Sequence, residues 1–95
     1  MINMKRYIKS GLVVRGKYIR ANYDVPEEPA SCTTIVDNAK DEGADIEEYA
    51  TLYAYGLSNE DLVETVRLCD PNEASDKDCK KVCKAIQTEA LIRME

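Results

Sequence analysis

The chain has 95 residues, of which 44% are hydrophobic and 33% are charged, and it carries a net charge of −5 at neutral pH. This length suits one small domain, and the charged fraction excludes a protein embedded in a membrane. Histidine is absent, which also excludes nucleophilic pairs of serine or cysteine with histidine.

Residues 1–25 are predicted to form a two-stranded β-hairpin. Arg15-Gly16 suits its turn, because glycine readily adopts the positive φ that a two-residue turn needs. This turn places six mostly apolar side chains on one face: Ile8, Leu12, Val14, Ile19, Ala21 and Tyr23. A register shift of one residue would scatter them over both faces. A turn at Ser10-Gly11 is the alternative, and it would give shorter strands.

Residues 26–30 are predicted to form a proline-containing linker. Pro26 and Pro29 lack backbone donors and disfavour helix in the residues before them. The rest of the chain, residues 31–95, shows helical periodicity throughout.

The first two helices have clear ends. One apolar stripe follows Ser31, and Gly43 is suited to terminate that helix. The stripe contains Cys32, Ile35, Val36 and Ala39. Asp45 and Glu48 then have the spacing of a capping box at the start of the second helix, which Gly56 ends. Its buried face is predicted to contain Ile46, Tyr49, Ala50 and Tyr53, and the run around them predicts a central helix.

Two more helices follow with the same starting signal. Ser58 with Asp61, and Ser75 with Asp78, are spaced as capping boxes. The core face of the third helix is predicted to contain Leu62, Val66 and Cys69, with Val63 beside them. The fourth helix is predicted to bury Cys79, Val82, Cys83, Ile86 and Ala90. The expected fold is therefore α+β, a single domain over residues 1–95 with an N-terminal hairpin and about four short helices packed as a small helical domain.

The four cysteines are predicted to pack in the core. Cys32, Cys69, Cys79 and Cys83 all fall on apolar stripes, where a reduced cysteine acts as a small hydrophobic residue. A four-cysteine zinc site and a disulfide from Cys69 to Cys79 or Cys83 are the alternatives. Zinc is disfavoured because Cys79 and Cys83 lie within a helix rather than in a loop. We expect no metal and no cofactor.

Charge is distributed unevenly along the sequence. Residues 1–20 contain six basic side chains and no acid, residues 21–79 contain sixteen acids and three bases, and residues 80–95 carry a charge of +2. Such asymmetry affects association and partner choice rather than fold. Residues 1–17 also lack the apolar segment of a signal peptide, so we expect a cytoplasmic protein with no membrane association.

One candidate surface is the basic outer face of the hairpin. It would present Lys5, Tyr7, Lys9, Tyr18 and Arg20. Basic side chains interleaved with aromatic rings hold single-stranded nucleic acid, by attraction to its backbone and stacking on its bases. The alternative is an ordinary solvated face.

The other candidate, called the acidic surface below, gathers near predicted helix starts. It contains Asp41, Glu42, Asp45, Glu47, Glu48, Tyr55, Glu60, Asp61 and Glu64. Acids are stabilised near helix N-termini, and solubility explains the charge equally well. Glu60 and Glu64, however, are four residues apart and repel each other, which is consistent with a surface that meets a basic partner. Tyr55 is included as an exposed aromatic anchor.

The sequence contains no glycine-rich phosphate loop, acidic metal-binding pattern or nucleophile elbow, so we expect no enzymatic activity. In length and acidity the chain is similar to small accessory proteins of bacteriophages and mobile elements, many of which inhibit host defence complexes. We expect an adaptor or inhibitor that docks on a larger partner through the acidic surface, and a partner that handles nucleic acid would receive it in a basic groove. A single-stranded nucleic-acid-binding module is the alternative.

Overall fold

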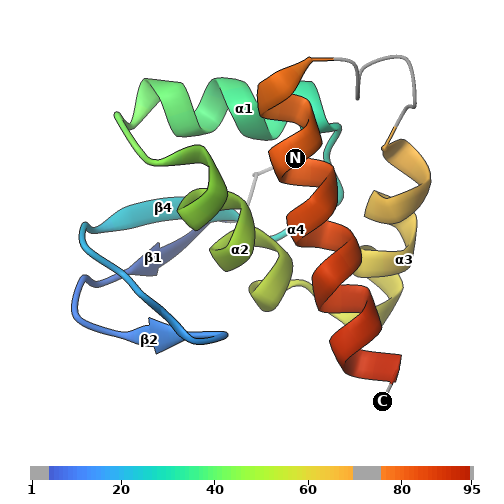
Figure 1. Cartoon of the computed structure of the whole chain (residues 1–95), viewed down its shortest axis with the longest axis horizontal. Coiled ribbons are helices and arrows are strands. Elements are labelled where there is room, and N and C mark those ends of the chain that lie inside the picture. Colours follow the sequence, from blue (N-terminus) through green and yellow to red (C-terminus); the bar gives the residue numbers. More distant parts are fainter. Residues whose placement is uncertain (1–4, 70–75, 95) are drawn as a thin grey trace.

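Among the residues that the structure describes, strands occupy the N-terminal part and four helices follow (Figure 1). The computed structural model describes residues 5–69 and 76–94. The elements are β1 (Lys5–Ile8), β2 (Val13–Val14), β3 (Lys17–Tyr18), β4 (Tyr23–Pro26), α1 (Cys32–Asp41), α2 (Ile46–Gly56), α3 (Asn59–Leu68) and α4 (Lys77–Met94). This order confirms the predicted α+β class. None of the helices in these two ranges is both long and apolar enough to cross a bilayer.

The hairpin turns where the sequence predicts. Arg15 and Gly16 have φ angles of 50° and 79°, and a type I′ turn requires positive φ at both of its central residues. β1 pairs with β4 in antiparallel register, with Ile8 opposite Tyr23, and β2 pairs with β3. The strand β4 includes Pro26, so the extended chain continues one residue into the expected linker.

The hairpin is split into two short sheets at Ser10-Gly11, where the alternative turn was placed. Ile19 N–H donates to the Leu12 carbonyl at 2.8 Å, and the Ile19 carbonyl accepts from Gly11 N–H at 2.8 Å. Gly11 has a φ angle of 94°. Two residues therefore oppose one, as in a β-bulge. Leu12 and Ala21 are exposed, so the prediction that they join the buried face is wrong. The remaining members of that face are buried: Ile8, Val14, Ile19 and Tyr23.

The predicted helix starts at Asp45 and Ser58 are confirmed. The Asp45 side chain accepts a hydrogen bond from Glu48 N–H at 3.0 Å, and the Ser58 side chain accepts one from Asp61 N–H at 3.2 Å. Gly43, with φ 63°, follows α1 as expected. Side-chain caps thus fix the start of each of these two helices.

The start of α4 has a side-chain cap at Asp76. Ser75 lies outside the described residues, and Asp76 accepts a hydrogen bond from Asp78 N–H at 2.8 Å, as an N-cap does. The predicted stripe of α4 is buried at Cys79, Val82, Cys83 and Ile86. Cys79 and Cys83 are free thiols, so neither forms the disulfide with Cys69 that was the alternative.

The helix α2 is central, as predicted, and packs most extensively against α4 (Figure 1). Its buried Tyr49 donates from its hydroxyl to the carbonyl of Asp24 at 2.9 Å, and Tyr53 donates to the carbonyl of Glu28 at 2.6 Å. These bonds attach β4 and the segment after it to α2. They also satisfy two hydroxyls that would be costly to bury without partners.

The inward face of α3 contains Thr65 rather than Val63. Thr65 is fully buried, and its hydroxyl donates to the Asp61 carbonyl at 2.7 Å. Leu62 is buried as predicted, whereas Val63, which was expected beside the core face, is 54% exposed. The helix therefore presents an apolar side chain to solvent.

Candidate functional site

The acidic residues near the start of α2 are largely engaged within the fold. Glu48 accepts hydrogen bonds from Arg20 N–H at 2.9 Å and from the Tyr23 hydroxyl at 2.7 Å. Glu42 accepts one from Asp24 N–H at 2.9 Å. Burial and the bond to Glu48 raise the pKa of Tyr23. These carboxylates therefore attach the hairpin to the helices rather than standing free for a partner.

Two further members of the acidic surface are also engaged. Asp45 caps α2, and Glu47 lies 3.5 Å from the Lys17 ammonium. Asp41 is exposed, and its carboxylate makes no hydrogen bond or ion pair with a described residue. In this group, the Asp41 carboxylate is therefore the most available to a partner.

The acidic residues of α3 are arranged differently. Glu60 and Glu64 are exposed, and their carboxylates have no hydrogen-bond or ion-pair partner in residues 5–69 and 76–94. Val63 lies between them on the same face, and Arg67 follows one turn later. With Asn59 these side chains line a shallow hollow of about 360 Å³. We call Glu60, Val63, Glu64 and Arg67 the α3 outer face.

The acidic surface is therefore two separate groups rather than one patch. One lies at the start of α2, and the other follows its end, where Asp61 is half-buried. The eleven residues of α2 between them extend about 16 Å.

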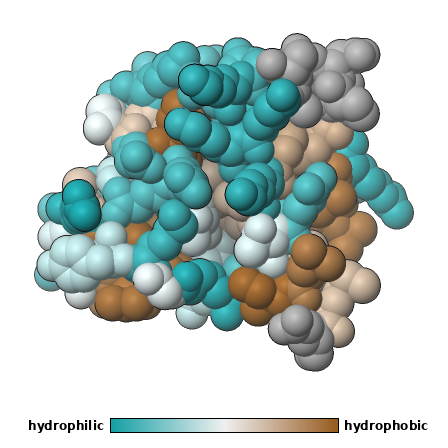
Figure 2. Space-filling view, in the orientation of Figure 1, coloured by the Kyte–Doolittle hydropathy of each residue, from teal (hydrophilic) through white to brown (hydrophobic). Residues whose placement is uncertain are grey.

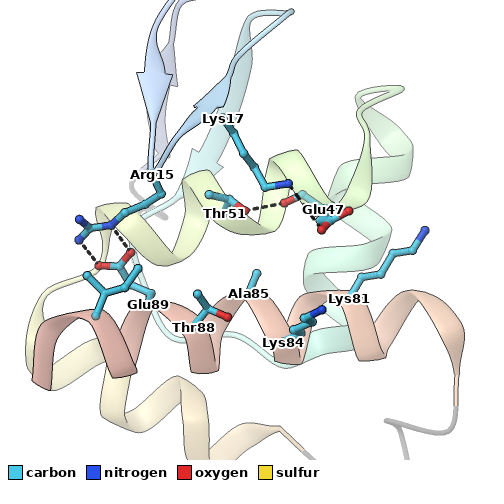
Figure 3. Close-up of a pocket in the computed structure, with 10 residues that line it drawn as sticks. Arg15, Lys17, Glu47, Thr51, Lys81, Lys84, Ala85, Thr88 and Glu89 are labelled. Atoms are coloured by element: carbon cyan, nitrogen blue, oxygen red, sulfur yellow. Dashed lines mark hydrogen bonds and ion pairs between the residues drawn. The ribbon is translucent and has the colours of Figure 1, made fainter. Parts of the chain in front are cut away.

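Tyr55 is exposed as predicted, but it belongs to a network that sequence reasoning missed. The Arg15 guanidinium lies 5.1 Å from the centroid of its ring, a cation–π contact. Arg15 also donates to both carboxylate oxygens of Glu89, at 2.9 and 2.7 Å (Figure 3). Arg93 donates to Glu89 at 2.7 Å. Glu89 is only 3% exposed, yet it is satisfied by two cations.

Arg15 and Arg93 favour the ionised form of the Glu89 carboxyl group. Burial raises its pKa, but the hydrogen bonds from Arg15 and Arg93 outweigh burial and hold the pKa below its ordinary value of 4.5. Glu89 follows Ile86 by three residues on the α4 stripe. A carboxylate at a core position was the signal that could have revealed the network.

Two arginines from outside α2 satisfy its C-terminal carbonyls. Arg6 donates to the Leu52 carbonyl at 3.1 Å, and Arg93 donates to those of Ala54 and Tyr55 at 3.2 and 3.1 Å. Cations at this end of a helix also complement its dipole. The network thus joins the hairpin and α4 to the end of α2.

The basic hairpin face is partly confirmed in its exposure. Tyr7 and Tyr18 are 58% and 60% exposed, and Lys9 and Arg20 are exposed too. The side chain of Lys5 lies outside the described part of the structure. Beside Tyr18 is a hollow of about 390 Å³ whose lining has three carboxylates, those of Asp45, Glu47 and Glu48, against two cations, Lys17 and Arg20. This excess of negative charge disfavours a phosphate backbone at that end of the face.

No cluster of three cysteine or carboxylate side chains that could hold a metal occurs within residues 5–69 and 76–94. The predicted site residues that stay exposed without a side-chain hydrogen bond or ion pair to a described residue belong to three groups: Glu60 and Glu64 of α3, Asp41, and the hairpin residues Tyr7, Lys9, Tyr18 and Arg20. No protein-family model, curated protein or solved structure matches the chain.

Proposed function

We propose that the protein is a non-catalytic interaction module of the cytoplasm, an adaptor or inhibitor that docks on a larger protein through the α3 outer face. The supporting observation is the exposure of Val63 between two carboxylates that have no partner among the described residues. An apolar centre with a polar rim is the usual anatomy of a protein interface. The spacing of the face, from Glu60 to Arg67, is that of a helix that binds in a groove.

Charge complementarity selects the class of partner. Glu60 and Glu64 repel each other across one helical turn, and a lysine or arginine of a partner would remove that repulsion. A basic groove that normally receives nucleic acid offers such side chains. We therefore propose that the protein is an accessory protein of a bacteriophage or mobile element, and that it blocks a host nucleic-acid-handling defence complex.

Hydrophobic residues near the α3 outer face could extend the contact. Figure 2 shows hydrophobic side chains gathered around the lower end of α4 and beside α3. The exposed apolar residues of these two helices include Leu91 and Met94 of α4 and Leu68 of α3. Arg93 donates to Asn59 at 3.0 Å, which places the end of α4 against the start of α3.

The test is affinity purification from the native host, followed by a binding measurement with the purified partner. We expect the variant Glu60→Lys/Glu64→Lys to bind roughly tenfold or more weakly than the original chain. We also expect the affinity of the original chain to fall as salt concentration rises.

Asp37→Lys/Asp41→Lys is the matched control, because it makes the same change in net charge at exposed acids of α1. It should retain affinity. Equal loss in both variants would show that net charge alone drives binding, and loss in the control alone would place the interface at α1. Either result contradicts the proposal, as does the absence of any stoichiometric partner.

Single-stranded nucleic-acid binding is the second candidate function, and the exposure of Tyr7 and Tyr18 favours it. Binding of labelled single-stranded DNA or RNA at low salt, lost in Lys9→Glu/Arg20→Glu, would support this function. If micromolar protein does not retard the labelled nucleic acid in a gel, this function is excluded. The carboxylates beside Tyr18 make it the weaker candidate.

A further inference from the structure

A groove lies between α2, α4 and the tip of the hairpin, away from the α3 outer face (Figure 3). Its volume is about 420 Å³, within the range of about 300–1,000 Å³ that is usual for small-molecule sites. Ala85, Thr88 and Ile92 line it from α4, and Thr51 lines it from α2. These methyl-bearing side chains offer a surface for an apolar body.

The groove is positive within a negative protein. Its lining contains four cations, Arg15, Lys17, Lys81 and Lys84, against two carboxylates, Glu47 and Glu89. The local charge is therefore +2, whereas the whole chain carries −5. A concave site lined by one sign of charge concentrates ligands of the opposite sign.

The four cations are not equally available. Arg15 is held by the buried Glu89 at 2.7 Å, and Lys17 lies 3.5 Å from Glu47. Lys81 and Lys84 form no ion pair with any residue in the described ranges. They are three residues apart on α4, a spacing that makes two side chains neighbours on a helix. Figure 3 places both lysines away from the end that the Arg15–Glu89 pair closes.

We infer that this groove binds a small organic anion. Lys81 and Lys84 hold its carboxylate, sulfonate or phosphate group, and Ala85 and Ile92 contact its apolar body. The site is independent of the α3 outer face, so it can be present or absent whatever the partner-binding experiment shows.

Methyl NMR of the full chain tests the inference with three probes. Anilinonaphthalene sulfonate combines an anionic group with aromatic rings, phenylnaphthylamine has comparable rings without the charge, and inorganic phosphate has charge without an apolar body. We expect the sulfonate to shift the methyl signals of Ala85, Thr88 and Ile92 in a saturable way. The other two probes should bind roughly tenfold or more weakly.

Three double variants, two at Lys81 and Lys84 and one at control lysines, locate the anionic group. Lys81→Glu/Lys84→Glu, and the milder Lys81→Gln/Lys84→Gln, should weaken sulfonate binding roughly tenfold or more. Lys77→Glu/Lys80→Glu changes the same charge on exposed positions of α4 outside the groove and should leave binding unchanged. Circular dichroism checks that each variant folds.

Several results would overturn the inference. One is equal affinity for the sulfonate and its uncharged analogue. Another is unchanged binding in both Lys81/Lys84 variants. A third is a set of shifts centred on Val63 and Leu91 rather than on the groove, because it would show adsorption to exposed apolar residues.

Discussion

Arg15, at the tip of the hairpin, and Glu89, in the last helix, form two hydrogen bonds of 2.9 and 2.7 Å across 74 residues of sequence. Glu89 is buried, and Arg93 supplies its second cation at 2.7 Å. This pair attaches the strands to the helical part of the fold and closes one end of the groove beside α4 (Figure 3).

Replacing Glu89 with alanine should lower the free energy of unfolding by about 2–4 kcal/mol, because two cations lose their shared partner. Arg15→Ala should cost less, since Glu89 keeps the bond from Arg93. Urea denaturation measures both values. Gln87→Ala, an exposed change in the same helix, is the control, and a Glu89→Ala variant as stable as this control would refute the role of the pair.

Acid should destabilise the protein in part through Glu89. The pKa of Glu89 in the folded state lies below 4.5, so the unfolded chain binds this proton first as pH falls. The pair therefore contributes its full stability above the pKa that Glu89 has in the unfolded chain. This contribution is lost as pH falls through the folded-state pKa. Glu89→Gln does not titrate, so its free energy of unfolding should fall less steeply as pH decreases through the folded-state pKa of Glu89. Parallel curves for the variant and the original chain would contradict this assignment.

Tyr49→Phe should cost about 1 kcal/mol, because the Asp24 carbonyl loses a buried donor. Burial and the negative charge of Glu42 raise the pKa of Tyr49, so its hydroxyl is protonated and able to donate near neutral pH. Tyr7→Phe, at an exposed ring, is the matched control and should change stability little. Thermal and urea unfolding would compare the two, and equal stabilities would show that the bond contributes nothing.

Gly16→Ala should destabilise the hairpin by roughly 1 kcal/mol, because Gly16 has φ 79° and an alanine side chain is strained there. Nothing lies within 4 Å of a Cβ at this position, so crowding is not the cause. Gly16→Asn should cost less, since asparagine tolerates this conformation better. If the two variants are equally stable in urea, backbone strain does not determine stability at this turn.

Local sequence signals predicted the helices because their causes are local. Asp45 and Ser58 cap helices by bonding backbone groups three residues away, so spacing alone reveals them. The hairpin register was equally readable from Ile8 and Tyr23. The exposure of Leu12 was not, because regular pairing is interrupted at Gly11-Leu12, where two residues oppose Ile19.

The candidate sites were harder to predict because their charges are engaged by distant residues. Glu48 lies near a helix start in sequence, but in the fold it accepts hydrogen bonds from Arg20 and Tyr23. Counting acids along the chain cannot separate such a carboxylate from Glu60, which is exposed. Glu89 was missed for the same reason, since Arg15 is far from it in the sequence.

Site-specific photo-cross-linking in the native host tests the proposed docking face most directly. A photoreactive amino acid replaces Val63 in one variant and Val13 in another; these positions are 54% and 67% exposed, on α3 and on the hairpin. We predict a single protein adduct from position 63 and none from position 13. The absence of a protein adduct from position 63, with adducts to protein or nucleic acid from position 13 instead, would contradict docking through α3.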